Sequence, residues 1–343
     1  MRDFAAKVTA WQKRHGRHDL PWQNTRDAYR IWLSEVMLQQ TQVTTVIPYY
    51  RRFLERFSNL ATLAQAPLDE VLELWSGLGY YSRARNLHLA AQTVVARHAG
   101  RFPRDFEAVL ALPGVGRSTA AAICVFAHGG RHAILDGNVR RLFARCFGIG
   151  GYPGDVDVQA RLWRKAEKVL PRRELVAYTQ GLMDLGAAVC VRGKPRCHAC
   201  PLRRGCVAYQ KDRIAELPAP RPRKTLPQRR TRMLVLLHAG QVLLEKRAAS
   251  GIWGGLWSLP EIGSGADLTA LCAQRYGVEV AAHEPMPKVA HDFTHFKLEI
   301  EPQKIVAARV SPRAAAPGVI WLPLEESLGA AIPAPVRRIL AAL

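Results

Sequence analysis

Four of the seven cysteines in the chain lie on one short stretch, at Cys190, Cys197, Cys200 and Cys206. Their spacing, C-x6-C-x2-C-x5-C, brings four soft sulfur ligands together. Four thiolates can hold a tetrahedral zinc ion, although zinc sites usually contain two C-x2-C pairs and only one is present here. They can also hold a [4Fe–4S] cube, whose larger body suits uneven spacings. A disulfide knot is the third possibility, and the reducing compartment that we expect argues against it.

The stretch that holds these cysteines is strongly basic, with five positive side chains at Arg192, Lys194, Arg196, Arg203 and Arg204. Over the whole chain, 49 lysines and arginines stand against 28 aspartates and glutamates, which gives a formal net charge of +21. Such an excess predicts a polyanionic partner, and positive side chains that point outward could meet phosphates. The alternative is a basic protein whose charged surface is simply solvated.

Two carboxylates differ from the others in their surroundings. Glu35 lies inside the apolar stretch IWLSEVMLQ, and Asp136 follows an apolar pair in ILDGNVRR, just before an expected helix. A glutamate in a helix is most often solvated, and an aspartate in such a position is most often a helix cap. The residues alone therefore leave the role of both carboxylates open.

The stretch LPGVGRSTAAAICVF predicts two helices joined by a tight turn from Pro113 to Gly116. Gly114 and Gly116 allow positive φ angles and a close approach of another backbone. The N–H groups of such a turn, at the start of a helix, suit a phosphate group. This is a helix-hairpin-helix pattern, and a plain corner between two helices is the alternative.

The elements that must position these residues change in type along the chain. Residues 1–216 predict an all-α domain, because apolar residues recur at i, i+3 and i+4 in AYRIWLSEVMLQQTQV, LDEVLELW, NLHLAAQTVVARH and STAAAICVFAH. Residues 217–230 are basic and rich in proline, which is typical of an exposed linker. Residues 231–343 predict a smaller α+β domain with strands in MLVLLHAGQVLLEKR and HFKLEIEPQKIVAARV and a closing helix in APVRRILAAL.

The composition also indicates a compartment. No apolar run approaches the roughly 18 residues of a membrane-spanning helix. The N-terminal stretch MRDFAAKVTAWQKRHG is charged and amphipathic, without the apolar core or cleavage site of a signal peptide. We therefore expect a cytoplasmic, nucleoid-associated protein with no membrane partner. Cys124, Cys146 and Cys272 lie in apolar surroundings and predict core residues.

The motifs occur along the chain in the order SEVMLQQTQV, GLGYYSRARNLH, LPGVGRSTA, ILDGNV and the four-cysteine loop. Together they closely resemble the adenine DNA glycosylases of the MutY type, in the helix-hairpin-helix base-excision superfamily. The resemblance covers nearly the whole chain. It implies two helical subdomains with a lesion pocket between them, one [4Fe–4S] cluster and a C-terminal Nudix-like recognition domain. The implied partner is double-stranded DNA with adenine opposite 8-oxoguanine or guanine, bound by a monomer.

The resemblance assigns roles to the two carboxylates. Glu35, partly desolvated on its apolar helix, would be held protonated and would donate its proton to N7 of adenine. Asp136 would stay ionised and stabilise the oxocarbenium-like sugar, and Asn138 would orient it.

The resemblance also implies contacts with an opened duplex, because the adenine must leave the base stack before it can be excised. By family position, Gln40 and Tyr80 would wedge into the duplex and Gln180 would help to read the flipped base. The four loop cysteines would ligate the cluster.

The nearest rival in the superfamily is a pyrimidine-lesion glycosylase with lyase activity, of the endonuclease III type. Its lyase step needs a lysine amine just after the hairpin to form a Schiff base. Here that position is Ser118, and no lysine occurs between Lys13 and Lys165. The sequence therefore predicts hydrolysis by water, with Ser118 among the residues that contact DNA.

The C-terminal domain departs from an active Nudix hydrolase, which binds metal and pyrophosphate through G-x5-E-x7-R-E-U-x-E-E. Gly255 and Glu261 keep the opening of this pattern. Other residues occupy its later Arg and Glu positions: Thr269, Ala270, Ala273 and Gln274. Because the metal carboxylates are gone, we expect no hydrolysis of a nucleotide.

The family reads 8-oxoguanine with a Phe-Ser-His loop, and this chain has Phe293, Thr294 and His295. Threonine keeps the serine hydroxyl, so we expect the same role. A β-turn with a core phenylalanine is the alternative. A further alternative for the whole chain is a non-enzymatic DNA-binding iron–sulfur protein. It would explain the charge and the thiolates but not two acids at catalytic positions.

Overall fold

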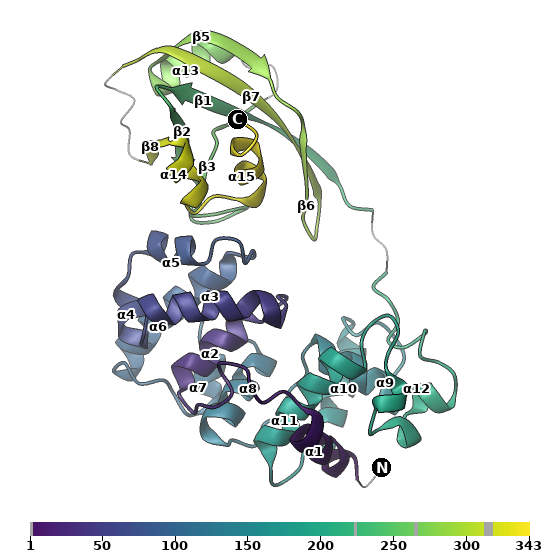
Figure 1. Cartoon of the computed structure of the whole chain (residues 1–343). Helices are drawn as coiled ribbons and strands as arrows, with labels where there is room; N and C mark the ends of the chain where they lie inside the picture. The colour runs from purple at the N-terminus through teal and green to yellow at the C-terminus, as the bar shows by residue number, and fades with distance from the viewer. Residues whose placement is uncertain (1–2, 223–224, 264–266, 312–317) are drawn as a thin grey trace. The chain divides into compact units, whose positions relative to one another are not determined.

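The computed structural model describes residues 3–222, 225–263, 267–311 and 318–343 (Figure 1). Contacts group the chain into two compact units, the first made of residues 1–65 and 86–223 and the second of residues 66–85 and 224–343. Residues 66–85 belong to the helical stretch of the sequence but are grouped with the second unit. The units therefore do not divide at a single point of the sequence, and each is described by itself.

Helices dominate the chain up to Gln210. The elements are α1 (Phe4–His15), α2 (Ala28–Met37), α3 (Val43–Arg56), α4 (Leu60–Gln65), α5 (Leu68–Leu74), α6 (Ser82–His98), α7 (Phe106–Leu110), α8 (Arg117–His128), α9 (Gly137–Phe147), α10 (Val156–Lys168), α11 (Leu175–Asp184), the π-helical turn η1 (Leu185–Val189), the 3-10 turns η2 (Cys197–Ala199) and η3 (Arg203–Gly205), and α12 (Val207–Gln210).

The helix α2 has a well-defined start and end. Asp27 caps its first turn, because its carboxylate accepts a hydrogen bond from the Tyr29 N–H at 2.9 Å. The stretch AYRIWLSEVMLQQTQV does not continue as one helix: α2 ends at Met37 and α3 begins at Val43. Between them Gln40 has a φ of 60°, a left-handed conformation that a helix cannot contain.

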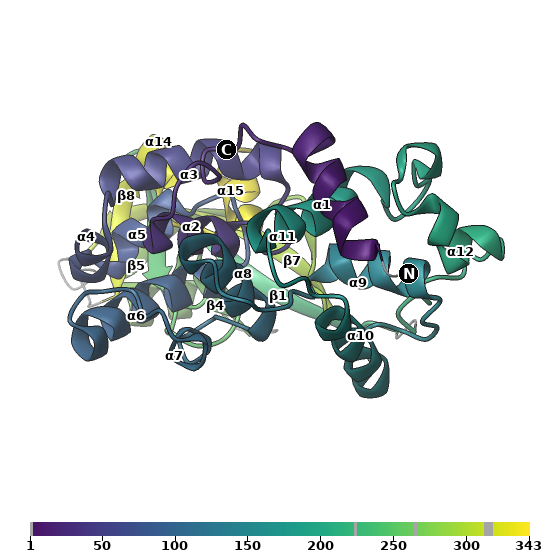
Figure 2. The same cartoon turned by 90° about the horizontal axis from the view of Figure 1, so that it is seen from below.

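The first helix of the chain is held by a distant part of the sequence. Figures 1 and 2 both show α1 beside α11, and the two helices are in contact. Phe4 on α1 makes edge-to-face contacts with Phe143 on α9 (5.7 Å between ring centroids) and Tyr178 on α11 (6.4 Å). This aromatic core fixes α1, α9 and α11 as one block.

The second unit contains a mixed sheet with the strand order β3-β2-β1-β7-β5. In addition, β4 pairs with β1, β8 pairs with β2, and β6 pairs with β7. The elements are β1 (Gln228–His238), β2 (Gln241–Lys246), β3 (Trp257–Ser258), β4 (Glu261–Ile262), α13 (Leu268–Tyr276), β5 (Val278–Pro285), β6 (Val289–Asp292), β7 (Lys297–Val310), β8 (Val319–Pro323), α14 (Leu324–Gly329) and α15 (Ala334–Leu340).

Helices cover both faces of this sheet. Met233 and Val235 of β1 belong to one core cluster with residues of α15, whereas Leu234 and Leu236 belong to a second cluster with residues of α13. Successive side chains of a strand point to opposite faces, so a strand that is buried on both sides must be apolar at every position. This explains the continuous run MLVLL.

The predicted fold class, an all-α part followed by a smaller α+β part, is confirmed. The first strand of the second part, β1, begins at Gln228, within the predicted linker. The long strand β7 extends the pairing back to this point, with Gln228 opposite Lys297. Residues 223 and 224 of the predicted linker lie outside the described residues.

Candidate active site and cysteine loop

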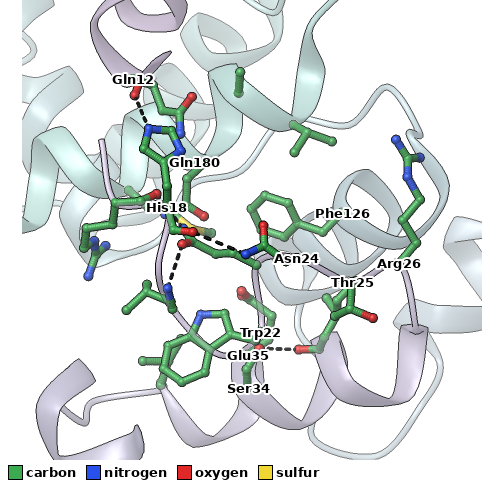
Figure 3. Close-up of a pocket in the computed structure, with 18 of the residues that line it drawn as sticks. Gln12, His18, Trp22, Asn24, Thr25, Arg26, Ser34, Glu35, Phe126 and Gln180 are labelled. Carbon is green, nitrogen blue, oxygen red and sulfur yellow. Dashed lines mark hydrogen bonds between the residues drawn. The ribbon is translucent and has the colours of Figure 1, made fainter. Parts of the chain in front are cut away.

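A cavity of about 630 Å³ lies among α1, α2, α8, α11 and the segment between α1 and α2 (Figure 3). Trp22 and Phe126 line it with aromatic rings, and Glu35 and Gln180 supply polar groups. Among the described residues that line it there is no lysine. Polar and charged side chains thus share the walls with apolar ones, and a cavity that combines the two can hold a small molecule or a single base.

Among the described residues, Glu35 is one of two carboxyl groups that line this cavity, and Glu174 at the start of α11 is the other. Glu35 lies on α2, one turn before the end of the helix, and its side chain is partly buried. Burial raises the pKa of Glu35 to about 8, and the charge of Asp136 adds to this shift. Glu35 therefore keeps its proton at neutral pH, which is what a general acid requires.

Asp136 is the N-cap of α9, as its sequence context indicates. Its carboxylate accepts a hydrogen bond from the Val139 N–H at 2.7 Å. Burial raises the pKa of Asp136, while hydrogen bonds from the backbone N–H groups of Val139 and Asn138 act in the opposite direction. The cap and the electrostatic coupling to Glu35 coexist, so the capping interpretation does not exclude a chemical role.

Ser118 helps to hold the segment that carries Asp136. Ser118 lies in the first turn of α8, and its hydroxyl accepts a hydrogen bond from the Leu135 N–H at 2.9 Å. The hairpin is thereby tied to the residue just before the aspartate. Ser118 was expected to contact DNA, but its hydroxyl has this partner inside the protein.

Asn138 is connected to the cysteine loop through an arginine that the sequence did not single out. Arg141 donates to the Asn138 side-chain oxygen (2.8 Å) and to the backbone oxygens of Gly186 (2.6 Å) and Cys190 (2.7 Å). A Cβ at Gly186 would lie 2.7 Å from the Asn138 Cβ, so α9 and η1 can approach this closely only because residue 186 is glycine.

Gln180 is fixed by a buried ion pair that was also missed. Its amide nitrogen donates to Asp184 at 2.9 Å, and Asp184 in turn binds the Arg17 guanidinium at 2.6 Å. Asp184 is 1% exposed, so its charge needs a partner. An acid inside the apolar helix GLMDLG was the signal that could have revealed this pair.

The two predicted wedge residues share an uncommon backbone conformation. Gln40 has a φ of 60° and Tyr80 a φ of 49°, and both are exposed. Such left-handed angles are costly for residues other than glycine, and they cluster at functional sites. Gly114 in the hairpin has a φ of 75°, as expected, whereas Gly116, which caps α8, has an ordinary φ of −92° and no close neighbour that requires glycine.

The four loop cysteines line one common cavity together with Leu142, Arg145 and Cys146 of α9. Arg145 is 4% exposed and donates to the backbone oxygens of Val191 (2.7 Å) and Leu217 (2.7 Å) and to the Cys190 sulfur at 3.6 Å. Within the described ranges, no three His, Cys, Asp or Glu residues are grouped as ligands of a single metal ion would be.

The predicted recognition residues occupy the turn between β6 and β7. Phe293 stacks on Phe296, with 4.5 Å between ring centroids, and its N–H bonds to the Phe296 carbonyl oxygen. Thr294 and His295 are exposed at the tip, and their side chains lie 3.4 Å apart. The turn therefore has an anchored aromatic base and, at its tip, two exposed hydrogen-bonding groups that contact each other.

In the part of the second unit that corresponds to the Nudix pattern, the remaining glutamates form ion pairs within the chain. Glu261 of β4 binds Arg247 at 2.7 Å. Glu245 of β2 binds Arg275 at 2.8 Å and accepts a hydrogen bond from the Tyr276 hydroxyl at 2.8 Å. Both carboxylates of this segment are thus paired with arginines of the same chain.

Comparison with known proteins gives matches in both parts of the chain. Residues 33–168 match the family described as HhH-GPD superfamily base excision DNA repair protein, and residues 232–342 match the NUDIX domain. The adenine DNA glycosylase of Buchnera aphidicola subsp. Acyrthosiphon pisum is 36% identical, over 98% of this chain and 96% of the relative. The adenine DNA glycosylase of Mus musculus is 32% identical, over 98% of this chain and 77% of the relative.

Solved structures resemble a smaller share of the chain. A thermostable thymine-DNA glycosylase is 32% identical with a TM-score of 0.56, and the match covers 61% of this chain and 97% of that one. A non-covalent endonuclease III–DNA complex is 23% identical with a TM-score of 0.53, covering 62% of this chain and 95% of that one. The second likeness shows a shared fold.

Proposed function

The chain belongs to the adenine DNA glycosylase family, a family of N-glycosyl hydrolases in base excision repair, and on that premise we propose that it excises adenine paired with 8-oxoguanine or guanine. The proposed substrate is double-stranded DNA, bound by a monomer. The net charge of +21 supports a polyanionic partner. No described helix could cross a membrane. The proposed place of action is the nucleoid in the cytoplasm.

We propose Glu35 as the general acid. Cleavage of the N-glycosidic bond leaves a negative charge on the departing base unless the base is protonated. Glu35 lines the cavity, and a pKa of about 8 keeps it protonated at neutral pH. In this site its proton passes to N7 of the flipped adenine.

We propose that Asp136 stabilises the sugar cation. Two carboxyl groups that interact in a buried site do not ionise together easily, so one carries the proton and the other the charge. The N–H groups that point at Asp136 favour its charged form, whereas Glu35 receives no such help. Asn138, held by Arg141, orients the capped turn, and water completes the hydrolysis.

Further residues would open the duplex and hold the base. Gln40 and Tyr80, exposed in left-handed conformations, are proposed as the wedges. The turn from Gly114 to Gly116 would bind a backbone phosphate through its N–H groups. Gln180, fixed by Asp184, would read the flipped adenine. Ser118 would act by positioning Asp136.

The cysteine loop suits a [4Fe–4S] cluster, which family members generally carry. Cys190, Cys197, Cys200 and Cys206 line one cavity, and their uneven spacing with a single C-x2-C pair suits a cube better than zinc. The cube would bind four thiolates and stiffen a loop that buries few side chains of its own. The outward basic residues of the loop would then meet DNA phosphates.

The second domain would recognise the base opposite the adenine. Thr294 and His295 are exposed neighbours in the turn that Phe293 anchors, and we propose that their two hydrogen-bonding groups contact the base. Nudix hydrolysis is not proposed, because arginines pair with the remaining carboxylates.

The observation that carries this function is the protonated Glu35 inside a lysine-free cavity. The test compares duplexes containing adenine opposite 8-oxoguanine, adenine opposite guanine, and an oxidised pyrimidine. We expect free adenine from the first two, an intact sugar–phosphate strand until alkali is added, and no release of the pyrimidine. Release of the pyrimidine with strand nicking would instead support the endonuclease III type.

A further inference from the structure

Cys146 was expected to be an ordinary core cysteine, but its surroundings are specific. It lies on α9, is 2% exposed, and lines the same cavity as the four predicted cluster ligands. The sulfur of Cys206 lies 3.6 Å from the carbonyl oxygen of Arg145, the residue next to Cys146 on α9. Five thiols, rather than four, therefore surround this cavity.

The other two cysteines outside the loop differ. Cys124 lies within the buried face of α8, where the nearby charge is that of Asp105. Cys272 lies on α13 in the sheet core of the second unit. Neither lines the cluster cavity. The position of Cys146 is thus not a general property of buried cysteines in this chain.

Cys146 and Cys206 belong to segments of different kinds. Cys206 ends the 3-10 turn η3 and is only partly buried, and its sulfur lies 3.6 Å from the Arg145 carbonyl oxygen. Cys146 is in the last turn of α9, whose neighbours Leu142 and Phe143 are fully packed. The thiol of Cys146, on a packed helix, is therefore held beside the loop segment that supplies Cys206.

We propose that Cys146 is a reserve ligand of the cluster, which takes the iron corner of Cys206 when the Cys206 sulfur is not available. The inference rests on the proposed cluster. The exchange is a ligand substitution without change of oxidation state. The iron–sulfur bond to Cys206 breaks and its sulfur takes up a proton, while Cys146 loses its proton and binds the same iron.

The test uses the full-length protein and the variants Cys206→Ser, Cys146→Ser and the double variant. Iron and acid-labile sulfide per chain and the visible absorbance are measured after anaerobic purification. We expect the wild type and both single variants to contain about four irons per chain, the content of one cube. The double variant should lose most of its iron.

Two controls separate the possible outcomes. Cys200→Ser removes a ligand at a different corner from the one beside Cys146 and should lose the cluster alone, whereas Cys124→Ser should keep it. Far-ultraviolet circular dichroism checks that each variant is folded. If Cys206→Ser is as poor in iron as the double variant, or if Cys146→Ser alone loses the cluster, the reserve role is wrong. A wild type without iron would instead overturn the proposed cluster itself.

Discussion

Excision as proposed requires one protonated and one ionised carboxyl group that interact electrostatically. Glu35 and Asp136 come from different helices, and burial raises the pKa of both. The difference between them is the pair of backbone N–H groups at the start of α9, which favour the charged form of Asp136 only. The helix cap is therefore the device that decides which carboxyl carries the proton.

The pH dependence of excision follows from this arrangement. The rate should fall by about tenfold per pH unit above pH 8, as Glu35 loses its proton. It should also fall at acid pH, as Asp136 becomes protonated, which gives a bell-shaped profile that belongs to the coupled pair. Single-turnover rates between pH 5 and 10 measure this profile. A rate that still rises above pH 9 would contradict the role of Glu35.

Ionisation of Glu35 should also lower the free energy of unfolding of the protein. The folded-state pKa of Glu35 lies above its unfolded value, so the stability of the wild type decreases as pH rises from about 4.5 to 8. Glu35→Gln removes this loss, and its advantage in melting temperature should be near zero at pH 4 and largest above pH 8. Exposed Glu55 on α3 provides the control variant Glu55→Gln. A constant difference at all pH values would show that Glu35 titrates normally.

Removal of the negative charge at Asp136 should strongly reduce the rate of excision. In Asp136→Asn the amide oxygen can still cap α9, but no negative charge faces the sugar cation. We expect a loss of about 10²- to 10³-fold in single-turnover rate, the size of one electrostatic contact in a transition state. Thermal melting should change little. A large loss of stability with an unchanged rate per folded molecule would mark Asp136 as a structural cap only.

Residue types and spacing singled out the two acids and the four thiols as candidates, and the family resemblance gave the two acids their proposed roles. Residue types and spacing could not predict Arg17 as the partner of Asp184, because 167 positions separate the two residues. The same holds for Arg141, whose acceptors lie 45 and 49 positions away. Pairings of this kind are set by how α9 and η1 pack, which no local pattern encodes.

At the scale of elements, α9 links the active site to the cysteine loop. Its first residue follows Asp136, and its last turn carries Arg145 and Cys146 in the wall of the cluster cavity. The sequence predicted this helix and its start. It did not predict that one helix serves both sites, because the loop packs onto it from residues 190–206.

Arg145 provides the element-scale prediction. Arg145→Gln withdraws a buried guanidinium from several backbone oxygens, and each orphaned acceptor costs about 1–3 kcal/mol. We expect a lower melting temperature and iron loss on dialysis against a chelator. Arg204→Gln, an exposed change in the same loop, is the control. Equal iron retention in both variants would show that Arg145 does not hold the loop.

At the scale of the whole molecule, the proposed function divides the chain between an excision part and a recognition part. Glu35, Asp136 and the cysteine loop precede the linker, and the turn with Thr294 and His295 follows it. The order of the motifs made this division predictable. The grouping of residues 66–85 with the second unit was not predictable, because it depends on contacts over long sequence distances.

The recognition role predicts a selective loss. Thr294→Ala combined with His295→Ala should reduce the preference for 8-oxoguanine over guanine opposite adenine by the equivalent of about 1–3 kcal/mol, the value of one good base contact. Excision from the adenine–guanine mispair should stay nearly unchanged. A fragment ending at Leu217 should show the same loss. Affinities and single-turnover rates on both mispairs measure it, and an unchanged preference in both proteins would place recognition elsewhere.

The most direct test of the whole assignment is the single-turnover release of free adenine from an adenine–8-oxoguanine duplex by the wild type and Glu35→Gln. We predict that the wild type releases adenine and that the variant is slower by about 10²- to 10⁴-fold, because an amide cannot deliver a proton. The variant should still bind the duplex with similar affinity, because it keeps the shape of the side chain. Release of adenine by Glu35→Gln at the wild-type rate would contradict the proposed mechanism.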